Sequence, residues 1–85
     1  MNESGEIRVL AFGSATSLLG WSERSWPASA FSQLQQLVEH LESQFPQIAA
    51  ARGRVRYAIN RQYAGLETPL QAGDEVALIP PVSGG

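Results

Sequence analysis

The chain ends in Pro80-Pro81-Val82-Ser83-Gly84-Gly85, the segment with the most distinctive chemistry in the sequence. The two glycines have no Cβ, so their backbone is narrow and adopts positive and negative φ with equal ease. Such a segment can enter an active site in which a side chain would collide. The proline pair before it ends a strand and favours an extended spacer. We therefore expect residues 80–85 to present the Gly85 carboxylate to other enzymes for activation, in contrast to an ordinary frayed terminus.

Reactive side chains are scarce elsewhere. The sequence has no cysteine and no lysine, since all six of its basic residues are arginine. It therefore offers neither a thiolate nucleophile nor a lysyl Schiff base. The one histidine, His40, is expected on the exposed polar side of a helix. Glu39, Glu42 and Asp74-Glu75 lack the setting of a catalytic carboxylate pair or a metal site. We expect no metal and no stably bound cofactor.

Composition indicates an ordinary globular protein. The 85 residues are 44% hydrophobic and 16% charged, which is typical of one small folded domain spanning 1–85. The net charge of −2 gives no reason to expect nucleic acid or an anionic membrane as a partner. No apolar stretch approaches the roughly 20 residues of a membrane span. The acidic N-terminus lacks the basic region of a secretory signal, so we expect a cytoplasmic protein.

Alternating side chains predict several strands. In residues 6–12, one face carries Ile7, Val9 and Ala11 and the other carries Arg8, Leu10 and Phe12. Residues 13–20 are predicted to form a loop, and Arg52, Arg54 and Arg56 to share one face of an extended segment. Further strands are predicted over 21–26, ended by Pro27, over 55–59, over 63–65 after an Asn60-Arg61 turn, and over 75–79.

One main helix is predicted between these strands. Ser32 and Gln35 fit a capping box, and Pro46 should end the helix, with one more helical turn over 48–51. A single apolar stripe indicates packing on one face of a sheet. The predicted class is therefore α+β, a ubiquitin-like β-grasp with a mixed sheet of about four to five strands. The stripe consists of Leu34, Leu37, Val38, Leu41 and Phe45.

Most of the chain resembles a known family in order, and the last dozen residues carry the specific part of that resemblance. Gly73-Asp74-Glu75-Val76-Ala77 followed by residues 79–85 closely resembles the end of molybdopterin synthase small subunits, in the MoaD/ThiS family of ubiquitin-like sulfur carriers. Val9-Leu10-Ala11-Phe12-Gly13 and Ala58-Ile59-Asn60 add to the resemblance. The sequence departs from the family at Gln33, where relatives often begin the helix with threonine. A shifted helix cap is therefore expected.

The resemblance implies a mechanism in which this chain is a protein substrate and not an enzyme by itself. A ubiquitin-activating-type adenylyltransferase would use ATP to adenylate Gly85, and a sulfur donor protein would replace AMP to leave a thiocarboxylate. The large synthase subunit would use that sulfur on cyclic pyranopterin monophosphate, within a heterotetramer of two carriers and two large subunits. Phe12 and Ile79 would contact the partner. The residues that thread into the active sites would be Gly84, Ser83, Val82, Pro81 and Pro80.

Other functions stay open at this point. The chain could instead carry sulfur for thiazole or another metabolite, although thiazole carriers usually lack the proline pair. It could also be a ubiquitin-like modifier of target lysines, or an interaction module whose tail is incidental. Trp21 and Trp26 either fill the core or anchor an interface.

Overall fold

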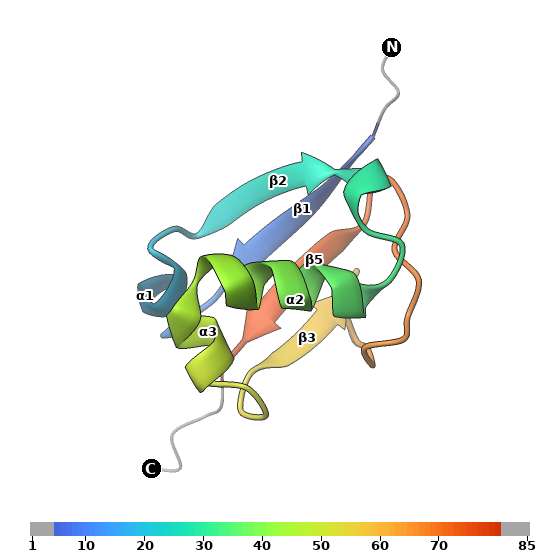
Figure 1. The fold of residues 1–85 in the computed structure, drawn as a ribbon. Helices are drawn as coiled ribbons and strands as arrows, with labels where there is room; N and C mark the ends of the chain where they lie inside the picture. The colour runs from blue at the N-terminus through green and yellow to red at the C-terminus, as the bar shows by residue number, and fades with distance from the viewer. Residues whose placement is uncertain (1–4, 81–85) are drawn as a thin grey trace.

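The computed structural model describes residues 5–80 as one mixed sheet with helices on one side (Figure 1). The strands occur in the spatial order β2-β1-β5-β3-β4, with β1 and β5 parallel and the other pairs antiparallel. This is the predicted β-grasp. The elements are β1 (Glu6–Ala11), α1 (Ala15–Leu19), β2 (Glu23–Pro27), the 3-10 turn η1 (Ala28–Ala30), α2 (Leu34–Gln44), α3 (Pro46–Ala50), β3 (Arg56–Ile59), β4 (Gln62–Tyr63) and β5 (Glu75–Ile79).

The core lies between α2 and one face of the sheet. Along β1, Ile7, Val9 and Ala11 are buried, as the alternation predicted. In β5, Val76 and Leu78 lie beside them, because Val9 pairs with Val76 and Ala11 with Leu78. The apolar stripe of α2 covers these side chains: Leu34, Leu37, Val38 and Leu41 are all buried and Phe45 is partly buried. We call the opposite, uncovered side of the sheet the open face.

The start of α2 differs from the predicted capping box. Its N-cap is Gln33, whose side chain makes no capping bond. The side-chain oxygen of Gln36 accepts hydrogen bonds from the Ser32 N–H at 2.6 Å and from the Ser32 hydroxyl at 2.9 Å. Gln35, the predicted partner of Ser32, instead donates to Glu39. The prediction was wrong by one residue because loop carbonyls outside the local sequence satisfy the first helical N–H groups: Leu34 donates to Thr68 and Gln35 to Leu66.

Two predicted extended or irregular segments adopt other structures. Residues 13–20 were expected to form a loop, yet they contain α1, which buries Ala15 and Leu19 and ends at Gly20 with φ 85°. Burial of these two side chains stabilises a helix too short to be stable alone. The three arginines do not share a strand, because residues 51–54 form a turn. Only Arg56 lies in β3, whereas Arg52 turns back to Glu42.

The turn of the β3–β4 hairpin was predicted correctly at Asn60-Arg61, but its second strand begins one residue earlier than predicted. Asn60 and Arg61 both have positive φ, 52° and 73°, as a two-residue hairpin turn requires. The return strand β4 begins at Gln62 and includes only Gln62 and Tyr63, because the chain leaves the sheet after Ala64.

Trp21 and Trp26 pack against the core between β2 and α2. Their ring centroids lie 5.9 Å apart, and Phe45 meets Trp21 edge-on at 5.8 Å. His40 is not fully exposed as predicted, because its ring packs edge-on against Trp26 at 5.6 Å and lies 5.5 Å from Phe31. This row of rings closes the β2 side of the core. Within residues 5–80, every helix is too short or too polar to cross a bilayer.

Candidate functional site

The predicted reactive segment begins where β5 ends. Pro80 follows Ile79, the last residue of β5, which lies between β1 and β3 in the middle of the sheet. The predicted sulfur-bearing residue and the other threading residues lie outside the described residues: Gly85, Gly84, Ser83, Val82 and Pro81. The structure therefore places the root of the tail on the central strand of the sheet. Backbone pairing on both sides fixes the position from which the tail leaves.

A tight turn after β1 packs against this root. Gly13 has φ +53°, and a Cβ there would lie 3.5 Å from Cγ of Pro80. The turn is held by hydrogen bonds, since the Gly13 carbonyl accepts from the Thr16 N–H at 3.1 Å and from the Thr16 hydroxyl at 2.8 Å. The Phe12 N–H donates to the Leu78 carbonyl at 3.3 Å, which links the turn to β5. The Phe12-Gly13 pair is thus tied to the exit of the tail.

Phe12 and Ile79 lie together on the open face. Phe12 is 50% exposed, and both residues line a hollow of about 360 Å³. Strand register explains the grouping, because Ala58 pairs with both Ala77 and Tyr63 across β3. The two small alanines form the floor and the larger side chains form the rim. We call this the open-face hollow; its lining is Phe12, Ala58, Arg61, Tyr63, Glu75, Ala77 and Ile79.

Charges on the open face form a short ladder beside the hollow. Arg8 on β1 lies 3.2 Å from a carboxylate oxygen of Glu75 on β5 and 3.8 Å from one of Glu23 on β2. These groups are exposed or partly exposed, so each pair contributes little to stability. They do leave the rim with both signs of charge, which suits contact with a partner protein better than with a highly charged ligand.

A side-chain latch ties the first residues of β5 to β3. Asn60 donates from its amide nitrogen to Asp74 at 3.0 Å, and its amide oxygen accepts the Glu75 N–H at 3.0 Å. The second carboxylate oxygen of Asp74 accepts the Gln71 N–H at 2.8 Å. Gly73 adopts φ +92° just before. These bonds give a physical reason for the Gly73-Asp74-Glu75 and Asn60 motifs: they set the register in which β5 delivers Ile79 and Pro80.

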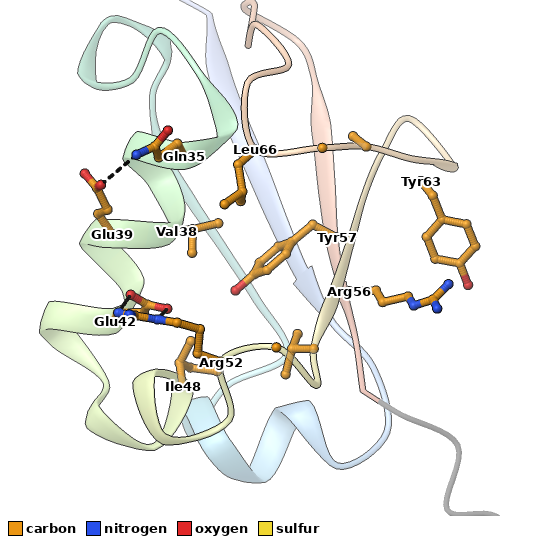
Figure 2. A pocket seen from close by; sticks show the side chains of 14 residues that line it. Gln35, Val38, Glu39, Glu42, Ile48, Arg52, Arg56, Tyr57, Tyr63 and Leu66 are labelled. Atoms are coloured by element: carbon orange, nitrogen blue, oxygen red, sulfur yellow. Dashed lines mark hydrogen bonds and ion pairs between the residues drawn. The ribbon is translucent and has the colours of Figure 1, made fainter.

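A second cavity lies on the helix side of the sheet. It has a volume of about 550 Å³ and lies between α2, the turn over 51–54 and β3. Figure 2 shows Tyr57 pointing from β3 toward α2, whereas Tyr63 and Arg56 lie on the other side of β3. Burial, with a smaller effect from Glu42, raises the pKa of Tyr57 to about 12. We call this cavity the helix–strand groove; its walls include Val38, Ile48, Val55, Tyr57 and Leu66.

One edge of the groove is closed by an ion pair. Arg52 donates to Glu42 through two nitrogens, at 3.0 and 2.6 Å. The hydrogen bond that Arg52 donates to Glu42 raises the pKa of Arg52, so the guanidinium stays charged. Two parallel bonds give this pair a fixed geometry. It holds the turn over 51–54 against α2.

Within residues 5–80, no three His, Asp or Glu side chains come close enough to hold a metal ion. The alternation in β5 predicted that Ala77 and Ile79 share a face. It did not predict that Arg61 and Tyr63 line the hollow, because the hairpin turn brings them there. The helix–strand groove had no sequence signal, since Tyr57 alternates like any half-buried strand residue.

Known proteins resemble this chain throughout its length. Residues 9–85 match the ThiS family. The chain is 35% identical over 82 residues to the molybdopterin synthase sulfur carrier subunit of Arabidopsis thaliana, covering 96% of this chain and 85% of that protein. The crystal structure of SAMP1 from Haloferax volcanii matches with TM-score 0.81 at 22% identity, over 95% of this chain and 100% of that one. A chain in the complex of subunits 1 and 2 of the molybdopterin-converting factor from Helicobacter pylori matches with TM-score 0.69 at 25% identity. The match covers 94% of this chain and 99% of that one.

Proposed function

Because this chain belongs to the ThiS family, we propose that it is the sulfur carrier subunit of a molybdopterin synthase. Residues 1–85 act as one carrier domain and residues 80–85 as its working tail. The proposal rests chiefly on the sequence Ile79-Pro80-Pro81-Val82-Ser83-Gly84-Gly85, which continues directly from the central strand β5. The carrier contributes the reactive carboxylate, and the catalytic side chains belong to its partners.

Activation must overcome the poor reactivity of a carboxylate. The Gly85 carboxylate attacks the α-phosphate of ATP in a ubiquitin-activating-type adenylyltransferase, and pyrophosphate leaves. The terminal sulfur of a persulfide on a donor protein then attacks the acyl carbon, and AMP leaves. A second thiol attacks the donor-side sulfur of the resulting acyl disulfide, which leaves the donor in a disulfide and releases the carrier as a thiocarboxylate. AMP is a far better leaving group than oxide, so adenylation makes the exchange possible. ATP is thus a substrate of the activating enzyme and not a cofactor of this chain.

The thiocarboxylate then delivers sulfur inside the large synthase subunit, to cyclic pyranopterin monophosphate. Gly84 and Gly85 have no side chains to obstruct a narrow entrance, and Pro80 and Pro81 hold the tip away from the sheet. A tethered sulfur atom acts at a high effective concentration and needs no free sulfide. The proposed location is the cytoplasm, where ATP is available for the activation step.

The open-face hollow is the proposed contact surface for the large subunit. Phe12 exposes half of its surface beside Ile79 and the root of the tail. An apolar anchor at the edge of a polar rim is the usual composition of a protein interface. A complex of the two subunits is known for the related molybdopterin-converting factor of Helicobacter pylori. In the proposed heterotetramer, each of two large subunits binds one carrier in this way.

Intact-mass measurement tests the activation step. The full-length protein is incubated with its activating enzyme, ATP and a sulfur donor, and its mass is followed with and without ATP. We expect ATP-dependent exchange of one oxygen for sulfur at the C-terminus, and none in a variant that lacks Gly85. Covalent adducts of high mass without any thiocarboxylate would instead identify a ubiquitin-like modifier. Sulfur transfer in the presence of the large subunit then distinguishes the molybdopterin route from a thiazole route.

A further inference from the structure

The strand edge beside the helix–strand groove has no neighbour over part of its length. β4 pairs only with Ala58 and Ile59, and the Ala64 N–H donates to the Tyr57 carbonyl at 3.0 Å. The chain then leaves the sheet for α2, where the Leu66 carbonyl accepts the Gln35 N–H at 2.8 Å. Val55 therefore lies beyond the end of β4. Val55 directly precedes β3, and within residues 5–80 no strand pairs with it on the side where β4 pairs with Ala58 and Ile59.

The backbone groups of Val55 are directed toward that open edge. Consecutive residues of an antiparallel strand present their N–H and C=O groups to opposite edges of the strand, so residues two apart present them to the same edge. The Tyr57 carbonyl faces β4, so the polar groups of Val55, two residues earlier, face the same way. Within residues 5–80, neither the N–H nor the C=O of Val55 has a hydrogen-bond partner. An unpaired strand edge of this kind is a template for an added strand.

The two sides of this edge differ in chemistry. On the helix side, the groove offers apolar walls from Val38, Ile48 and Leu66 (Figure 2). On the open face, Arg56 is exposed, and its guanidinium lies 5.6 Å from the ring centroid of Tyr63. Among the described residues, Arg56 has no carboxylate within ion-pair distance.

The two glutamates that line the groove already have partners. Glu42 is already paired with Arg52, and Glu39 accepts a hydrogen bond from Gln35. Among the described residues, the charge at this strand edge that has no ion-pair partner is therefore the positive charge of Arg56. A segment lying along this edge would meet apolar side chains on one face and Arg56 on the other.

We infer that the groove and the free edge at Val55 bind an extended peptide segment of a partner protein, in which apolar and acidic residues alternate. The segment adds as a short strand beside Val55. Its apolar side chains enter the groove and its carboxylates face Arg56, since side chains alternate between the two faces of a strand. The groove lies on the opposite side of the sheet from the open-face hollow, although Arg56 borders that hollow through its neighbours Ile79 and Tyr63. The inference does not depend on the proposed sulfur chemistry.

Two other occupants fit the groove less well. A second copy of this chain, paired edge to edge, would bring arginines opposite arginines, which is unfavourable across strands. A small apolar molecule would fit a cavity of about 550 Å³. It would, however, leave the Val55 backbone groups and Arg56 without partners.

A pair of synthetic peptides tests the inference. The first is acetylated and amidated and alternates glutamate with valine and phenylalanine; the second has lysine in place of each glutamate. Each is titrated into the isotope-labelled full-length protein, followed by amide chemical shifts and hydrogen exchange. We expect the acidic peptide to perturb Val55, Val38 and Leu66 and to slow exchange of the Val55 amide. We expect it to bind about fivefold to tenfold more tightly than the lysine peptide.

Charge reversal separates recognition from a structural effect. In Arg56→Glu, the preference should invert, so that the lysine peptide binds more tightly than the acidic one. Arg24→Glu is the matched control, because Arg24 lies on β2 at the opposite edge of the sheet and its reversal should leave the preference unchanged. Equal affinity for the two peptides, shifts centred on Phe12 and Ala77, concentration-dependent self-association at this edge, or no shifts at about 1 mM peptide would each overturn the inference.

Discussion

At the scale of single residues, the pKa of Tyr57 depends on where the fold places its side chain. The sequence presents it as one of several alternating strand residues, but in the fold it lies between α2 and β3, partly out of contact with water (Figure 2). Its neutral hydroxyl is tolerated there, whereas its phenolate would be poorly solvated and close to the Glu42 carboxylate. The ionisation of this one group therefore depends on the fold.

Stability should consequently fall at high pH through Tyr57. The pKa rises from 10.0 in the unfolded chain to about 12 in the folded protein, so below pH 10 both states are protonated and stability is complete. Between pH 10 and 12 the unfolded chain ionises first and unfolding becomes easier. We expect a loss of about 1–2 kcal/mol from this group, after allowance for the water that reaches it.

Urea denaturation of the protein and of Tyr57→Phe at pH 10 and pH 12 measures that contribution. The phenylalanine variant has no hydroxyl to ionise, so its free energy of unfolding should fall less over this interval. Parallel decreases in the two proteins would contradict the assignment, since the loss would then come from other groups.

Phe12 is a residue whose exposure points to binding and not to stability. It is 50% exposed at the open-face hollow, so Phe12→Ala should change the free energy of unfolding by less than about 1 kcal/mol. Loss of an apolar anchor should weaken binding to the large subunit at least about tenfold. Calorimetric titration of the two purified subunits measures the affinity.

Leu66→Ala is the matched control for Phe12→Ala. Leu66 is 45% exposed but lies in the helix–strand groove, away from the open-face hollow. Its replacement should leave affinity for the large subunit unchanged. If the Leu66 variant lost more affinity than the Phe12 variant, the proposed contact surface would be on the wrong side of the sheet.

At the scale of elements, the β3–β4 turn and β5 act as one unit. The sequence predicted the Asn60-Arg61 turn, because Asn tolerates positive φ. It did not reveal that the Asn60 side chain also binds Asp74 and the Glu75 N–H. These partners are 14 and 15 residues away, so no local pattern identifies them. The helix cap at Ser32 was misassigned for the same reason: its missing partners come from residues 66–68.

Two substitutions separate the functions of Asn60. Asn60→Gly keeps the left-handed backbone but loses both side-chain hydrogen bonds, whereas Asn60→Ala loses the bonds and strains a φ of 52°. We expect Asn60→Ala to cost about 2–3 kcal/mol and Asn60→Gly about 1 kcal/mol less. Equal losses in urea denaturation would show that backbone conformation contributes nothing at this turn.

At the scale of the whole molecule, folding and reactivity are assigned to different parts of the chain. Within residues 5–80, the buried apolar residues run from Ile7 to Leu78, so the core of the described chain ends before Pro80. The proposed chemistry belongs entirely to residues that follow. A partner protein can therefore hold the folded domain while the tail reacts, and the core of the domain is not disturbed.

Removal of residues 81–85 tests this separation. We expect the free energy of unfolding to change by less than about 0.5 kcal/mol, because the buried apolar residues of the described chain end at Leu78. Thiocarboxylate formation should be abolished, as judged by intact mass after incubation with the activating enzyme, ATP and a sulfur donor. A large drop in thermal stability would mean that the tail contributes to the fold.

Local physical chemistry in the sequence was sufficient for the β-grasp, for the burial of Ile7, Val9 and Leu37, and for the grouping of Arg8 and Leu10 on the opposite face. Such features follow from the periods of strands and helices, which any short window of residues displays. The tertiary structure alone decided that Ala58, Ala77 and Tyr63 form a hollow beside Phe12. The tertiary structure also decided that a groove forms at Tyr57, that Val55 has no neighbouring strand beyond the end of β4 among the described residues, and that Arg52 lies against Glu42. Those features depend on where distant segments stop and turn away, and that is set by packing across the whole chain.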